Sequence, residues 1–243
     1  MHAPGVDVRR AADRARTTTT WLDSRHSFSF GPHYDPANTS HGLLLASNDD
    51  VVRPGGGFAM HPHRDVEIVT WVLRGTLAHR DSTGRSSVLH PGSAQRVSAG
   101  SGILHSERND AAGHPAVDVR FVQMWVAPDG WDRAPDHQQH ELEDAWLRSG
   151  LVPVVSGRRA DDAALRLGNR HAALRAARLV PGQVVHLPDA PYVHLFVATG
   201  GVALEGVGLV SAGDAVRLTW TGGHRLTAST DAEVLVWEMH ASA

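Results

Sequence analysis

The sequence predicts an all-β protein built from two β-barrels or sandwiches in tandem. Strand-like runs rich in Val, Ile, Leu, Thr and Trp recur along the 243 residues, and Gly or Pro turn signals separate them. The first half has no long amphipathic helix, and the strand pattern returns after a polar stretch at 129–162. Many short strands between such turns are typical of sandwiches and barrels.

The strands of the first half can be placed in order. The run from Glu67 to Ala78 has the composition of a buried strand, and the hairpin signal Asp81–Gly84 follows it. In the stretch from Val117 to Val126, alternate residues share one face, because side chains in a strand alternate with a period of two. That face holds Val117, Val119, Phe121, Gln123 and Trp125. Short strands are also expected at 87–90 and 95–98.

A polar, Pro-punctuated segment separates the two halves. We expect residues 1–130 to form an N-terminal domain, 131–162 a connector with a short helix at 140–148, and 163–243 a C-terminal domain. Residues 172–179 (AALRAARL) have helical propensity, but their short length and the Pro-Gly turn that follows favour a strand. The remaining strands are expected at 151–155, 184–187, 193–198, 202–205, 215–219 and 233–239.

Composition excludes several classes of function. The net charge is −3, which gives no electrostatic footprint for direct binding of nucleic acid or of an anionic membrane. Cysteine is absent, which excludes disulfides, zinc fingers and thiol catalysis. The N-terminal segment lacks the apolar stretch of a signal peptide, and no apolar run is long enough to span a membrane. We therefore expect a soluble, cytoplasmic protein.

Two pairs of ligand-type residues stand at strand edges in the first half. His61 and His63 flank a proline, and His105 and Glu107 follow a Gly-rich turn. Residues i and i+2 of a strand point the same way, so each pair can aim into a barrel. One pair alone is equally consistent with a solvated loop, but two pairs in one domain favour a metal site. The donor set suits Fe, Ni, Cu, Zn or Mn and does not choose among them.

Three further residues are candidates for roles next to this site. Glu67 has an even offset from His63 and is a candidate acceptor for a ligand N–H. His79 either lines the pocket or is a hydrogen-bonded strand histidine. Gln123 is either a polar substrate contact or a barrel-mouth residue bonded to backbone. Trp71 and Trp125 are expected in the core.

The chain resembles the pirin family of the cupin superfamily. The resemblance rests on GGGFAMHPHRDVEIVTWVLRGTLAHRDSTG, on SAGSGILHSERN and on the strand with QMW, and it extends upstream to WLDSRHSFSFGPHYDP. It implies a bicupin, with two tandem cupin-type barrels (double-stranded β-helix, or jelly roll) and metal only in the first. It also implies His61, His63, His105 and Glu107 as metal ligands, although many other cupins would use a glutamate at the position of Glu67.

The resemblance also implies an activity. Pirin-like proteins are associated with quercetin 2,3-dioxygenase activity, so the expected substrates are a flavonol-like molecule and O₂. The expected cofactor is one divalent transition metal, with Fe(II) first and Ni, Mn, Co, Cu or Zn as alternatives. Glu107 would then also act as the catalytic base. Two alternatives stay open: an iron-dependent redox sensor that binds a regulatory protein partner, and a metal cupin acting on another small aromatic or enol substrate.

Overall fold

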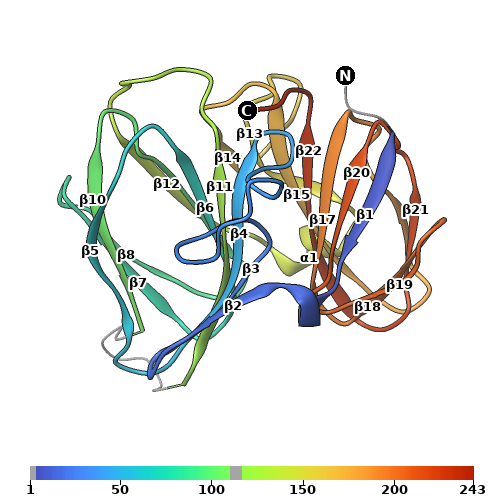
Figure 1. The fold of residues 1–243 in the computed structure, drawn as a ribbon, viewed down its shortest axis with the longest axis horizontal. Coiled ribbons are helices and arrows are strands. Elements are labelled where there is room, and N and C mark those ends of the chain that lie inside the picture. Colours follow the sequence, from blue (N-terminus) through green and yellow to red (C-terminus); the bar gives the residue numbers. More distant parts are fainter. Residues whose placement is uncertain (1–3, 110–116) are drawn as a thin grey trace.

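Strands make up most of the molecule. The computed structural model describes residues 4–109 and 117–243. The strands form two seven-stranded and two four-stranded sheets. In each half of the molecule, a seven-stranded sheet faces a four-stranded one across an apolar interior, which gives two jelly-roll units side by side (Figure 1).

The first unit carries the two pairs of ligand-type residues. Its large sheet has the order β12-β9-β6-β11-β4-β3-β2, and its small sheet the order β5-β10-β7-β8. The bounds of the large-sheet strands are β2 Ala15–Thr18, β3 Leu22–His26, β4 Leu44–Val52, β6 Glu67–Arg74, β9 Ser93–Ser98, β11 Val119–Val126 and β12 Asp136–Glu141. Those of the small sheet are β5 Gly57–His63, β7 Leu77–Asp81, β8 Ser86–Leu89 and β10 Ile103–Arg108.

The second unit repeats this plan with a large sheet β1-β20-β17-β22-β15-β13-β14 and a small sheet β16-β21-β18-β19. Its large-sheet strands are β1 Gly5–Arg9, β13 Val152–Ser156, β14 Leu165–Arg166, β15 Ala172–Leu179, β17 Tyr192–Thr199, β20 Ala215–Thr219 and β22 Ala232–Met239. The small-sheet strands are β16 Val184–His186, β18 Gly201–Leu204, β19 Gly208–Ser211 and β21 Arg225–Ala228. A 3₁₀ turn at Ala11–Asp13 and the helix α1 at Asp144–Arg148 complete the elements.

The two large sheets pack back to back. Their outward faces share one apolar cluster, to which β6 and β11 of the first unit and β15 and β22 of the second all contribute. Trp71 and Trp237 are the largest side chains in this cluster, and both are almost fully buried. Leu147 of α1 also lies in it, so the helix seals the space between the units. The joint core makes the second unit a cover for the first unit's large sheet.

The all-β, two-unit fold predicted from the sequence is confirmed, and 172–179 is a strand. Three details differ. The helix begins at Asp144 rather than at 140. The expected connector contributes β12 to the first unit and β13 to the second. Strand β1 pairs with β20, so residues 5–9 belong to the second unit although they precede the first unit in the sequence. The exact domain boundaries stay a prediction.

Candidate metal centre

Three histidines from two neighbouring strands converge inside the first unit. Strands β5 and β10 are antiparallel, with His61 directly opposite His105 and His63 two residues further along β5. Because i and i+2 share a face, all three imidazoles point into the same space. The Nε2 atoms of His61 and His105 lie 3.0 Å apart, and the three ring centroids are 4.5 to 4.8 Å from one another.

The nitrogen atoms of these rings are arranged as metal ligands require. The Nδ1–H of His61 donates to the Ala59 carbonyl at 2.7 Å, which leaves the Nε2 lone pair for the centre. The Nε2 of His63 is buried and has no hydrogen-bond partner among the described residues. One nitrogen from each histidine lies within 4.8 Å of the others. This donor set of three imidazoles fits a divalent transition metal.

The local sequence explains the conformation of β5 beside the three histidines. Pro62 stands between the two histidines of β5, and β5 is an edge strand, where a proline removes no ladder hydrogen bond. Gly57, at the start of β5, has φ +145°, and a Cβ there would lie 2.4 Å from the Glu107 carbonyl oxygen. Only glycine allows β5 to approach β10 so closely.

Glu107 is buried beside His105 and is held by the opposite sheet. Gln123 Nε2 donates to its Oε2 at 2.7 Å, and the Thr70 hydroxyl donates to its Oε1 at 3.4 Å. A β-bulge between His105 and Glu107 re-aims the strand at this point, as bulges commonly do beside functional sites. Within the same 4.8 Å limit, Glu107 groups with His105 and His79 rather than with all three converging histidines.

Burial keeps two of the histidines neutral. Desolvation, reinforced by the other histidines, lowers the pKa of His63 to about 4. The same causes lower the pKa of His105 to about 3. Both rings are therefore deprotonated at neutral pH and available as ligands without first releasing a proton.

A cavity of about 300 Å³ adjoins the centre. His61, His63 and Glu107 line it. The rings of Trp125 and Phe30, which meet edge to face at 5.3 Å, also line it, together with Phe58 and Leu22. A polar wall of Thr17, Ser24, His26, Asn48, Asp50 and Gln123 completes it. A mostly apolar pocket with a few convergent polar groups is typical of a small-molecule site.

Comparison with known proteins gives the family. The pirin family model matches residues 7–126. A Mycobacterium tuberculosis protein named "Putative quercetin 2,3-dioxygenase" is 60% identical over 236 residues, which is 97% of this chain and 96% of that protein. The chain belongs to the pirin family. An Escherichia coli protein named quercetin 2,3-dioxygenase is 34% identical over 235 residues, 96% of this chain and 98% of that one.

Solved structures extend the likeness to the whole fold. The crystal structure of YhhW from Escherichia coli superposes with a TM-score of 0.88 at 30% identity, over 98% of this pirin and all of that chain. A second structure of bacterial pirin YhhW, in complex with nickel(II), gives a TM-score of 0.87 over the same shares. The bicupin architecture of this pirin is thereby established.

Glu67 corrects one expectation drawn from the sequence. Its carboxylate accepts from the Ser98 hydroxyl at 2.8 Å and from the Gly168 N–H at 3.0 Å, on the side of β6 that faces the second unit. The even offset from His63 is misleading, because the two residues stand on different strands and the turn at 64–66 resets the alternation. Thr70, which reaches Glu107, has the opposite parity on β6.

His79 and Gln123 both lie close to the centre. His79 is fully buried behind His105, with ring centroids 5.3 Å apart, and its Nε2 lies 3.4 Å from Asp81 Oδ2. It does not line the cavity. Gln123 does line it, and the indole N–H of Trp125 donates to the amide oxygen of Gln123 at 3.1 Å. Trp71 is in the core, whereas Trp125 is half-buried at the cavity wall.

Apart from Gln123, the residues of the polar wall were not predicted from the sequence. Ser24 and His26 on β3 pair with Asp50 and Asn48 on β4, and Asn48 pairs in turn with Gln123 on β11. Directly paired residues point to the same face, so these polar groups line the inside of the large sheet. In the sequence, these residues are polar side chains at alternate positions of short strands. The same pattern is expected for a strand face exposed to solvent, so it does not identify a cavity wall.

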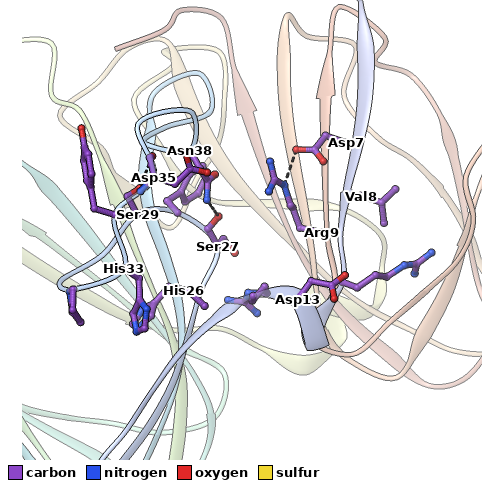
Figure 2. Close-up of a pocket in the computed structure, with 16 residues that line it drawn as sticks. Asp7, Val8, Arg9, Asp13, His26, Ser27, Ser29, His33, Asp35 and Asn38 are labelled. Carbon is purple, nitrogen blue, oxygen red and sulfur yellow. Dashed lines mark hydrogen bonds and ion pairs between the residues drawn. The ribbon is translucent and has the colours of Figure 1, made fainter.

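A second cavity, of about 530 Å³, lies between the two units and is polar (Figure 2). Asp7 and Arg9 project into it from β1, and their ion pair measures 2.8 Å. Ser27 and Asn38 approach from the loop after β3. His26 lines this cavity and the one beside the histidines, so its ring forms part of the wall between them.

The rest of the described chain offers no comparable centre. Within residues 4–109 and 117–243, clusters able to hold a metal occur only in the first unit. The interior of the second unit is filled by aliphatic side chains. In the same described ranges, no helix has the length and apolarity needed to cross a membrane.

Proposed function

We propose that this pirin is a metal-dependent dioxygenase that cleaves a flavonol in the manner of a quercetin 2,3-dioxygenase. The observation that carries the proposal is the convergence of three imidazoles and a buried carboxylate beside a mostly apolar cavity. The names of the relatives supply the substrate class, since they are called quercetin 2,3-dioxygenases.

His61, His63, His105 and Glu107 would hold the metal. Fe(II) is our first choice, with Ni, Mn, Co, Cu and Zn as alternatives. The nickel(II) complex of the related YhhW supports the choice of a divalent first-row ion. When bound, such an ion supplies Lewis-acid chemistry that makes a nearby enol hydroxyl more acidic.

Glu107 would take the proton from the substrate's 3-hydroxyl group. It is buried and has two neighbours that donate to it, Gln123 and Thr70. These donors fix the orientation of the carboxylate, and a fixed base within reach of a bound hydroxyl is what general base catalysis requires. Gln123 is itself held by Trp125, so the cavity wall and the base form one hydrogen-bonded chain.

The apolar side of the cavity would hold the flat substrate and exclude water. Trp125 meets His63 edge to face at 5.0 Å, and Phe58 meets Trp21 in the same way at 5.2 Å. These rings present flat, rigid surfaces next to the histidines. A dry site strengthens the electrostatic interactions that act on the substrate anion.

The test compares the wild type with His63→Ala, Glu107→Ala and the control His186→Ala, which changes an exposed histidine of the second unit. Each protein is reconstituted anaerobically with Fe(II), its metal content is measured by elemental analysis, and oxygen uptake with quercetin is recorded. The wild type and the control should bind about one ion per chain. His63→Ala should lose most of the metal, and both site variants should lose oxygen uptake.

Other results separate the alternatives. Metal bound at this level without oxygen uptake would favour a redox-sensing regulator or a different enol substrate. A partner protein whose affinity differs between the Fe(II) and Fe(III) forms would then support the regulator. The absence of metal from the reconstituted wild type would refute the metal centre itself.

A further inference from the structure

One buried carboxyl group in the cavity has no part in the proposed metal centre. Asp50 lies on β4, is 3% exposed, and lines the same cavity as His61 and His63. It pairs across the sheet with Phe121 and Ser24, so its side chain points into the first unit. Glu107 is near enough to repel its charge.

The carboxyl of Asp50 is only partly satisfied. The Ser24 side chain hydrogen-bonds it, but Oδ1 is buried and has no hydrogen-bond partner among the described residues. Arg14, a nearby cation, is occupied elsewhere, because its terminal nitrogens donate to the backbone carbonyls of Gly213, Arg25 and Ser47. A buried acceptor without a donor costs free energy, so its retention calls for a partner that arrives with a ligand.

The neighbouring aspartate shows what a purely structural carboxylate looks like on this strand. Asp49 points the other way and makes two bonds of 2.9 Å to Arg120. Both of its oxygens are engaged by one guanidinium, which is the strong bidentate arrangement. Asp50 has no such ion pair among the described residues and faces the cavity instead.

We propose that Asp50 is a specificity residue that accepts a hydrogen bond from a second hydroxyl group of the substrate, remote from the enol group held at the histidines. This inference rests on the proposed function. The preferred ligands are then polyhydroxylated flat aromatics, and the parent compound without additional hydroxyls binds more weakly. The hydroxyl supplies the donor that Oδ1 lacks, and the aromatic rings that line the same cavity hold the aromatic plane.

The experiment measures binding rather than turnover. Fe(II)-loaded full-length protein is titrated by calorimetry under strict exclusion of oxygen, with quercetin and with 3-hydroxyflavone, which keeps only the enol hydroxyl. The proteins are the wild type, Asp50→Leu, Asp50→Asn and the control Asp49→Asn. A hydrogen bond to a buried carboxyl group corresponds to about ten-fold in affinity. The wild type should therefore prefer quercetin by about that factor.

Asp50→Leu should lose the preference with little change in affinity for 3-hydroxyflavone, and Asp50→Asn should lose part of it. Asp49→Asn should keep it. If Asp50→Leu does not fold, Asp50→Asn decides the question. An unchanged preference in the Asp50 variants, or an equal loss for both flavonols, would overturn the inference and assign Asp50 a structural role. Failure of the wild type to bind either flavonol would instead remove the proposed function, and this inference with it.

Discussion

Asp49 and Asp50 are adjacent on β4, yet their side chains have opposite environments. Asp49 is paired with Arg120, whereas Asp50 faces the cavity with one oxygen unpartnered. Burial, the first cause, raises the pKa of Asp50 to about 7, and the nearby Asp49 and Glu107 charges add to it. Asp50 therefore destabilises the fold and lines a cavity, which is the combination expected of a residue that is kept for function at the expense of stability.

This pKa makes a prediction about stability. The pKa of Asp50 in the folded protein lies above its ordinary value of 3.8, which applies in the unfolded chain. As pH rises, the unfolded chain therefore ionises at lower pH than the folded protein, and the free energy of unfolding falls. The cost grows between pH 4 and 7 and then levels off. In metal-free protein, Asp50→Asn should raise the free energy of unfolding by about 2–3 kcal/mol more at pH 8 than at pH 5. Denaturant unfolding at both pH values checks this, and an equal effect at both would contradict the raised pKa.

At the scale of the element, β5 depends on how closely it approaches β10. Gly57→Ala should be strongly destabilising, because φ is +145° and the new Cβ would meet the Glu107 carbonyl oxygen at 2.4 Å. We expect a loss of about 2 kcal/mol or more in the free energy of unfolding, together with weaker metal binding as β10 shifts. Gly84→Ala is the matched control, since φ is +88° but nothing lies within 4 Å of its Cβ. Equal losses in the two variants would show that the contact with β10 is unimportant.

Strands and site residues could be predicted from the sequence where a short local pattern was enough to determine them. His61 and His63 could be paired from their spacing alone, because a strand repeats every two residues. The same rule failed for Glu67, because it holds within one strand and a turn intervenes. β12 escaped notice because DHQQHE is polar and half exposed, and its place is set by pairing with β9. The position of β1 in the second unit depends on contacts with β20, more than 200 residues away, and no local pattern carries that information.

At the scale of the whole molecule, the first unit carries the candidate metal centre and the second unit supports it structurally. The interior of the first unit carries the histidines, Glu107 and the polar wall, and every such group is a cost to packing. The interior of the second unit is aliphatic throughout its buried cluster. The joint core behind β6 and β11 connects the first unit, which buried polar groups destabilise, to the second unit, whose interior is aliphatic. The second unit thus stabilises the sheet that carries Gln123 and Thr70.

This joint core predicts that the units unfold together. Trp237 lies in the second unit, is 1% exposed, and donates its indole N–H to Met124 Sδ of the first unit at 3.1 Å. Trp237→Ala should lower the free energy of unfolding by about 3–5 kcal/mol, because it opens a cavity where the two large sheets meet. Calorimetry should still give a single transition, shifted to lower temperature for the whole chain, while Leu209→Ala, at a position 57% exposed in the same unit, should leave it in place. Two separated transitions, with the metal-dependent one unmoved by Trp237→Ala, would show that the units are independent and that the second is not needed to hold the first.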